Sequence, residues 1–149
     1  MDIAGKRFRK EEKLCSQKTI DSLFENGAVI YSGVLKVIWK TDVVAAPMVK
    51  AAFSAPKKTF KLAVTRNLIK RRMREAYRNN KHFLYNHISK KNISVSIFFI
   101  LRIDNTPDYK TIEKSIISAL TKLVNQVWLR VTTKKAALIL SSPTKLFPS

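Results

Sequence analysis

Acidic residues are scarce in this sequence. Only 10 Asp and Glu stand against 29 Lys and Arg in 149 residues, which gives a formal net charge of +19. A compact domain with so much charge of one sign repels itself, so a polyanionic partner is the simplest explanation. The candidates are nucleic acid and an anionic membrane surface, and a charge excess of this size favours nucleic acid.

Cysteine, glycine and long apolar runs are also scarce. The single cysteine, Cys15, cannot form an intrachain disulfide, which fits a reducing compartment. No apolar run reaches the roughly 20 residues of a membrane span, and the polar residues 1–13 do not resemble a signal peptide. We therefore expect a cytoplasmic protein. With only 3 glycines, a Gly-rich phosphate loop is not expected either.

The usual residues of a catalytic or metal site are missing as well. His82 and His87 lie five positions apart, so they would not share a helix face as an acid–base pair. Cys15 with either histidine is too small a ligand set for zinc, and no separated carboxylate pair is present for a two-metal site. We expect no catalytic residue and no metal ligand in the chain.

Hydrophobic residues nevertheless make up 46% of the sequence, enough for one domain with a core. Ser16 is placed to cap a short helix that ends at Asn26-Gly27. Strands are expected at residues 34–39 and 49–54, and residues 60–64 form either a third strand or a loop.

The second half of the chain begins with a helix expected over residues 67–81. Residues 93–103 form the most apolar strand, which is therefore placed in the centre of the sheet. Thr106 and Pro107 predict the start of a last helix. Its apolar stripe has helical spacing: Ile112, Ile116, Leu120, Leu123 and Val127.

These elements predict an α+β sandwich in the order helix, three strands, helix, strand, helix. The domain spans residues 14–130. A basic arm, residues 1–13, precedes it. Residues 131–149 show no clear periodicity and are interpreted as a flexible tail.

The helix over residues 67–81 has one strongly cationic face. Like charges recur at i,i+4, as in Lys70–Arg74 and Arg74–Arg78, and each such pair opposes helix formation by a few tenths of a kcal/mol. Phosphate binding would offset that cost, and the guanidinium group grips phosphate oxygens bidentately. The polar face comprises Asn67, Lys70, Arg71, Arg74, Arg78 and Lys81.

Two classes of nucleic-acid-binding protein are considered for such a helix. A structural RNA-binding protein, of ribosomal-protein or RNA-chaperone type, would explain the charge equally well. A DNA-binding recognition helix is less suitable, because base reading needs more varied side chains than this dense Arg-Lys run.

The segment RNLIKRRMRE, residues 66–75, resembles the RNR-type motif of the bacterial ribonuclease P protein component, whose pattern is roughly A-V-x-R-N-R-x-K-R-x-x-R-E. The resemblance extends over about residues 6–125. Three positions depart from it: Leu68 replaces the second Arg, Lys61 replaces a frequent Gly, and Ile20 replaces a frequent Phe. The matching residues are Ala63, Val64, Arg66, Asn67, Lys70, Arg71, Arg74 and Glu75.

The resemblance implies an αβββαβα two-layer sandwich, ribosomal protein S5 domain 2-like, with a left-handed βαβ crossover. It also implies the non-catalytic protein subunit of an endoribonuclease that removes the 5′ leader of precursor tRNA. The partners would be the catalytic RNA and precursor tRNA, with no membrane and no required protein partner. The RNA subunit would perform the chemistry with Mg²⁺, which the protein itself would not bind tightly.

The family's functional residues map onto two sets in this chain. Contacts to RNA are expected from Lys58, Arg66, Asn67, Lys70, Arg71, Arg72, Arg74 and Arg78. A cleft for the single-stranded leader is expected from Ile20, Phe24, Val37 and Trp39, since bases stack on aromatic side chains beside cationic grooves.

Overall fold

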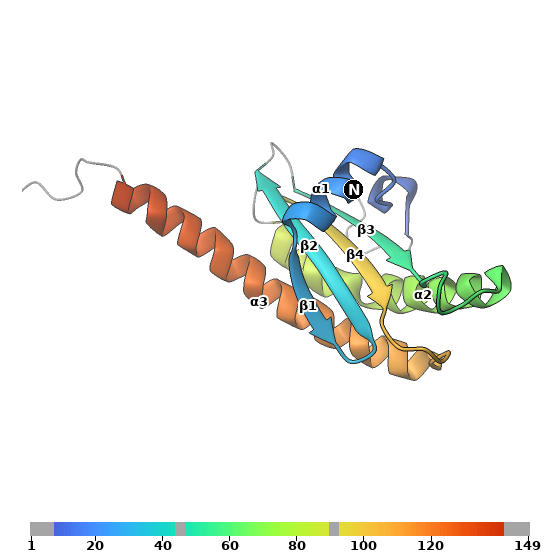
Figure 1. Ribbon diagram of the computed structural model, residues 1–149. Helices are drawn as coiled ribbons and strands as arrows, with labels where there is room; N and C mark the ends of the chain where they lie inside the picture. The colour runs from blue at the N-terminus through green and yellow to red at the C-terminus, as the bar shows by residue number, and fades with distance from the viewer. Residues whose placement is uncertain (1–7, 44–46, 90–92, 142–149) are drawn as a thin grey trace, which may run out of the picture.

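A computed structural model of the chain describes the backbone of residues 8–43, 47–89 and 93–141, and the side chains of the last helix as far as Leu129. A four-stranded sheet carries two long helices on one face and a short helix on the other (Figure 1). The elements are η1 Lys10–Glu12, α1 Gln17–Asn26, β1 Ala28–Ser32, β2 Leu35–Val43, β3 Met48–Ser54, α2 Ala63–Ile88, β4 Ile93–Leu101 and α3 Tyr109–Ser141.

The strand order is β1-β2-β4-β3, so β4 is central, as its apolar sequence predicts. It pairs antiparallel with β2 and parallel with β3. The β3-α2-β4 crossover is left-handed (Figure 1), against the strong general preference for the right-handed form. The predicted αβββαβα order and its crossover are both confirmed.

The short helix α1 has the predicted ends. The Ser16 hydroxyl accepts a hydrogen bond from the Thr19 amide at 3.4 Å, and the Gly27 amide donates to the Leu23 carbonyl at 2.8 Å. Gly27 also has no room for a side chain, because an added Cβ would lie 2.7 Å from Cγ2 of Ile38. Close packing of α1 on the sheet therefore depends on this glycine.

Residues 60–64 contain no strand, so of the two alternatives left open for them the loop that leads into a helix is confirmed. The strand missing from the sequence prediction is β1, a five-residue edge strand between two glycines, which is too short to show a clear period. Residues 60–64 instead lead into α2, which begins at Ala63 and reaches Ile88 because its apolar stripe continues through Leu84. This longer helix packs on β3 and against α3, which covers β1 and β2 on the same face of the sheet.

The last helix also differs from its prediction at both ends. Asp108, not Thr106, accepts the hydrogen bond of the first turn, from the Thr111 amide at 3.1 Å. The backbone stays helical to Ser141, so the helix continues past residue 130, where the clear periodicity ends. A flexible tail over residues 131–149 stays a prediction, and residues 142–149 lie outside the described part. All five predicted stripe residues, from Ile112 to Val127, are buried.

The N-terminal arm is part of the domain from Phe8 onward. The Phe8 ring packs edge-on against Phe53 and Tyr77, with centroid distances of 5.8 and 5.7 Å. The Leu14 amide donates to the Ala51 carbonyl at 3.0 Å, so the end of the arm pairs with the outer edge of β3. The predicted separate arm is therefore wrong for residues 8–13. Lys6 and Arg7 lie outside the described residues.

The two faces of the sheet bury different clusters. The face toward α2 and α3 holds the main core, with residues such as Val37, Trp39 and Phe99. The opposite face, covered by α1, holds a small cluster of Leu14, Leu23 and Ile38. Within the described ranges, no helix is long and apolar enough to cross a membrane.

Candidate nucleic-acid interface

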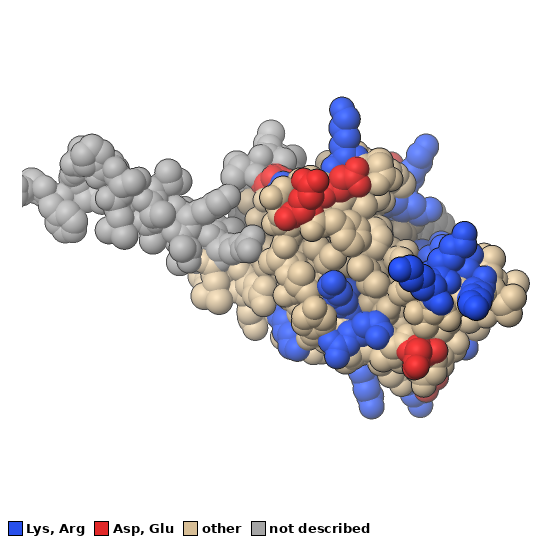
Figure 2. All heavy atoms as spheres, in the orientation of Figure 1, with Lys and Arg blue, Asp and Glu red and all other residues tan. Residues whose placement is uncertain are grey.

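Basic side chains gather at the N-terminal end of α2. Figure 2 shows Lys and Arg crowded over that end of the molecule. Asn67, Arg71 and Arg74 are exposed there and Lys70 is half-buried. Lys58 is exposed in the turn just before the helix. These predicted RNA-contacting residues lie on the first half of α2 or in the turn before it, and we call this region the cationic end of α2.

Arg66 also shapes this surface. Its Nη1 donates hydrogen bonds to the carbonyls of Phe60 and Lys61, at 2.7 and 2.9 Å. The side chain thereby fixes the path of the chain that enters α2, while remaining half-exposed. It can position the turn as well as contact an anion.

Two predicted RNA-contacting residues are engaged inside the protein. Arg72 donates to the Pro107 carbonyl at 2.7 Å and so ties α2 to the loop before α3. Arg78 pairs with Glu75 at 2.5 Å, and the hydrogen bond holds the pKa of Glu75 below its usual value. Phosphate would have to compete with these partners, so both residues are weaker candidates than Arg71 and Arg74.

Lys81 does not belong to the cationic face. Its side chain is only 3% exposed, and its Nζ lies 2.6 Å from Oε1 of Glu12. The prediction of an exposed Lys81 is wrong because Glu12 of η1 packs against Lys81 and Tyr85 on this part of α2. The sequence could not show this contact, which joins residues 69 positions apart.

The prediction of the leader cleft is wrong for two of its four residues. Val37 and Trp39 are 1% and 0% exposed and lie in the main core, facing α2 and α3. Successive side chains of a strand point to opposite faces, so the residues of β2 toward α1 are Lys36, Ile38 and Lys40. Their alternation was visible in the sequence, but the apolar set was assigned to the wrong face.

The other two predicted cleft residues do lie on the α1 face. Phe24 is 51% exposed, and its ring meets Phe98 edge-on with a centroid distance of 5.1 Å. Ile20, one turn earlier, is partly buried against the same cluster as Phe98 and Ile100. This flank of α1 thus offers an accessible aromatic ring over an apolar patch of the sheet.

Beside this flank lies a row of four residues, one from each strand, that we call the open strip. The strand pairings align Tyr31 with Lys36, Lys36 with Ile100, and Ile100 with Ser54. Tyr31 is exposed and the other three are half-buried. Sequence reasoning missed these residues. The available signal was the placement of lysines at alternate positions of β2, opposite its apolar residues.

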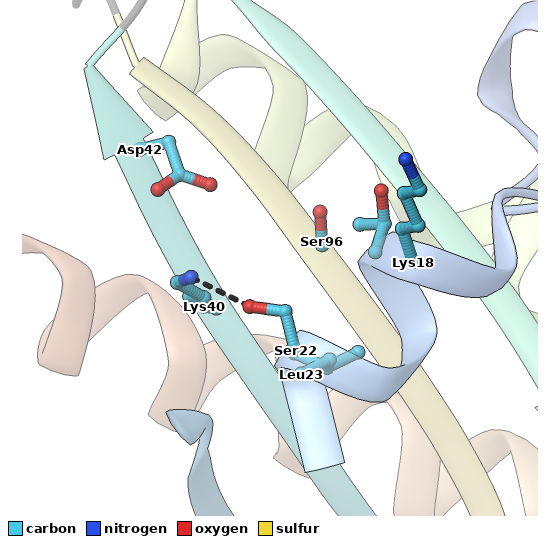
Figure 3. Close-up of a pocket in the computed structure, with 7 residues that line it drawn as sticks. Lys18, Ser22, Leu23, Lys40, Asp42 and Ser96 are labelled. Carbon is cyan, nitrogen blue, oxygen red and sulfur yellow. Dashed lines mark hydrogen bonds between the residues drawn. The ribbon is translucent and has the colours of Figure 1, made fainter. Parts of the chain in front are cut away.

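The other flank of α1 borders a polar hollow (Figure 3). Lys40 reaches across it and donates to the Ser22 hydroxyl at 2.9 Å. The hollow contains the Asp42 carboxylate as well as two lysines, so it suits a phosphate less well than the cationic end of α2 does. It is lined by Lys18, Thr19, Ser22, Leu23, Lys40, Asp42 and Ser96.

Candidate acid–base and metal-binding groups are dispersed. His82 and His87 are exposed on α2, and the His87 ring packs near that of Phe83 at 5.5 Å. Among the described residues, no group of three or more His, Cys, Asp or Glu could hold a metal ion. The exposed cations of α2 can bind an anion, and the exposed ring of Phe24 can stack a base.

Comparisons with known proteins show which family the chain belongs to. The family model named Ribonuclease P matches residues 8–124, which include all the strands and the whole basic helix. The chain belongs to the ribonuclease P protein family. It is therefore the protein subunit of the ribonucleoprotein ribonuclease P, which functions in tRNA 5′ processing, and it has an RNA partner in the holoenzyme.

Relatives from several bacteria support the assignment. The ribonuclease P protein component of Porphyromonas gingivalis is 32% identical over 119 residues, covering 79% of this chain and 87% of the relative. That of Chlorobium phaeobacteroides is 30% identical over 120 residues, covering 73% of this chain and 82% of the relative. The family match therefore extends over most of the domain.

Solved structures share the fold. The ribonuclease P protein of Staphylococcus aureus superposes with a TM-score of 0.56 at 20% identity, covering 76% of this chain and 95% of that one. The Thermotoga maritima protein gives 0.58 at 21% identity, covering 74% and 96%. The part of α3 that follows residue 124 lies beyond the family match.

Proposed function

We propose that this subunit binds the catalytic RNA through the cationic end of α2 and holds the 5′ leader of precursor tRNA on the α1 face of the sheet. The observation that supports this division is the path of the chain. Residues 55–62 lead from the end of β3, where the open strip begins at Ser54, into α2. One short segment therefore connects the two proposed binding surfaces, so a folded RNA on α2 could pass a single strand to the α1 face.

The residues differ in what they would contribute. Arg71, Arg74 and Asn67 are exposed and can contact phosphate oxygens of the catalytic RNA. Lys58 and Lys70 would add charge without fixed geometry. Phe24 would stack a leader base, and Lys36 would neutralise a phosphate beside it. Ile20 would close the apolar side of this contact without a stacking ring.

Phosphodiester cleavage is assigned to the RNA subunit, with Mg²⁺ bound mainly by that RNA. The protein would act by screening phosphate repulsion and by holding the leader, which together lower the Mg²⁺ concentration that the complex needs. A reducing compartment such as the cytoplasm suits the single thiol of Cys15, which is exposed.

Reconstitution with a bacterial ribonuclease P RNA tests the proposal. Addition of the protein should restore cleavage of precursor tRNA at low Mg²⁺, where the RNA alone is slow. Phe24→Ala should weaken holoenzyme binding to precursor tRNA by roughly 1–3 kcal/mol while leaving binding to mature tRNA unchanged. Glu25→Ala, on the adjacent exposed position, is the matched control.

Two results would contradict the proposal. If the protein gives no gain in cleavage at low Mg²⁺ with any bacterial ribonuclease P RNA tested, its role in the holoenzyme is not the one proposed. If folded Phe24→Ala binds precursor and mature tRNA with the wild-type ratio, the leader does not contact this flank of α1.

A further inference from the structure

Tyr31 and Arg102 form an exposed stack at the outer edge of the sheet. Tyr31 lies on β1 and is 56% exposed, and the Arg102 guanidinium carbon lies 5.0 Å from the centre of its ring. Arg102 follows β4 and is itself exposed. A flat cation over an aromatic ring presents the surface on which nucleobases stack in single-strand-binding proteins.

The side chain of Tyr31 faces the α1 side of the sheet. Its neighbours on β1, Ile30 and Ser32, are buried toward α3, and the Ser32 hydroxyl donates to the Ser115 carbonyl at 2.9 Å. Because side chains alternate along a strand, Tyr31 points to the opposite face. It is the outermost member of the open strip, next to Lys36.

The backbone beneath the stack is held firmly. The Ser115 hydroxyl accepts from the Val34 amide at 3.1 Å, and Lys122 donates to the Tyr31 carbonyl at 3.0 Å. The Arg102 amide donates to the Val34 carbonyl at 2.9 Å. Tyr31 and Arg102 are thus both anchored to the hairpin of β1 and β2, so stacking a base on them would cost little conformational entropy.

The position of the stack relates it to the proposed leader path. Neighbouring strands lie about 4.8 Å apart, so Tyr31 is roughly 14 Å from Ser54 across three strand spacings. Ser54 marks the end of the strip from which the chain continues, through residues 55–62, into α2. Figure 2 shows a second group of basic side chains over the lower ends of β1 and β2, separate from those at α2.

We propose that Tyr31 and Arg102 form a second stacking site for single-stranded RNA, which takes a nucleobase of the leader several nucleotides beyond the one held at Phe24. This inference rests on the proposed function, since it assumes that the leader enters along the open strip. Lys36, between the two aromatic contacts, would neutralise one of the intervening phosphates. Precursors with long leaders would therefore bind more tightly than precursors with short ones.

A series of precursor tRNAs with leaders from about 2 to about 12 nucleotides tests the site. Dissociation constants are measured for holoenzymes reconstituted with wild-type protein, Tyr31→Ala, Tyr31→Phe or Arg102→Ala. In the wild type, affinity should rise at a threshold leader length. Tyr31→Ala should remove that rise, a loss of about tenfold for one stacked base, and leave short leaders and mature tRNA unaffected. Tyr31→Phe should retain it.

Val29→Ala is the matched control, because Val29 lies two residues away on the same face of β1 and is 44% exposed. It should leave the length dependence intact. Tyr31→Leu keeps apolar bulk without a ring and should behave like Tyr31→Ala, which separates stacking from simple packing. Circular dichroism checks that each variant folds.

The outcomes separate this inference from the proposed function. If Phe24→Ala weakens all precursors but Tyr31→Ala leaves the length dependence unchanged, the leader binds at α1 and the second site does not exist. If neither variant changes any precursor relative to mature tRNA, the leader does not follow the open strip, and both proposals fail.

Discussion

The ammonium of Lys81 on α2 lies 2.6 Å from the carboxylate of Glu12 on η1, and the lysine is almost completely buried. The same carboxylate oxygen accepts a hydrogen bond from the Tyr85 hydroxyl at 2.5 Å. This contact fastens the N-terminal segment to the back of the basic helix. It therefore sets where the basic residues Arg9, Lys10 and Lys13 stand relative to the cationic end of α2.

Removal of the Glu12 charge should destabilise the fold. Glu12→Gln leaves the Lys81 ammonium buried without this counter-ion, and removal of one partner of a buried pair costs about 3–5 kcal/mol. Urea unfolding followed by circular dichroism measures the change. Glu11→Gln, at the adjacent exposed position, should change the free energy of unfolding by less than about 0.5 kcal/mol.

The double variant Glu12→Gln with Lys81→Met gives a second check on this pair. It removes both charges, so it should be more stable than Glu12→Gln alone. Equal stabilities of the single and double variants would show that the ion pair is not the source of the destabilisation.

The pH dependence of stability should report the same contact. Burial raises the pKa of Glu12, but the hydrogen bonds from Lys81 and Tyr85 outweigh it and hold the pKa below the usual 4.5. A carboxyl with a lowered folded pKa contributes stability above its unfolded pKa and loses it as the pH falls through the folded value. Unfolding free energies from pH 6 to pH 3 should fall less steeply for Glu12→Gln than for the wild type.

Trp39 should be a stability residue. It is 0% exposed in the core between the sheet and the long helices, so Trp39→Ala should lower the free energy of unfolding by about 3–5 kcal/mol. Phe24→Ala, on the exposed side of the sheet, should cost much less. Thermal unfolding of the two variants compares them directly, and comparable decreases would show that Phe24 also belongs to the core.

The sequence predicted the features that arise from local patterns. The capped helix at Ser16, the apolar stripe from Ile112 to Val127 and the central strand all follow from spacing between near neighbours. The family motif supplied the topology, including a crossover whose handedness no periodicity encodes. These parts of the fold are confirmed.

The errors arise where contacts are distant in the sequence. A helical wheel shows Lys81 on the same side as Arg74, but it cannot show that Glu12 covers it. Alternation in β2 separates Lys36 from Trp39, but it cannot tell which face of the sheet α2 and α3 cover. The sequence likewise gives no sign that Arg72, unlike Arg71, donates a hydrogen bond to the distant Pro107 carbonyl.

The contrast between Arg71 and Arg72 gives the sharpest test of the RNA-binding surface. Arg71 is exposed, so Arg71→Ala should weaken binding to the catalytic RNA and reduce the salt dependence by about 0.7–0.9 log units for each phosphate that the side chain neutralises. Arg74→Ala should behave similarly. Arg72→Ala removes the same charge but breaks the hydrogen bond to Pro107, so it should mainly lower stability.

Filter binding across a range of KCl concentrations, with unfolding measured on the same preparations, separates the two effects. The slope of log affinity against log salt reports phosphate contacts and is insensitive to a uniform fraction of unfolded protein, which shifts all points together. A reduced slope for Arg71→Ala with an unchanged slope for Arg72→Ala places the RNA on the outer face of α2. Equal slopes for both variants would mean that Arg72 leaves Pro107 to contact the RNA, and that the outer face alone does not define the interface.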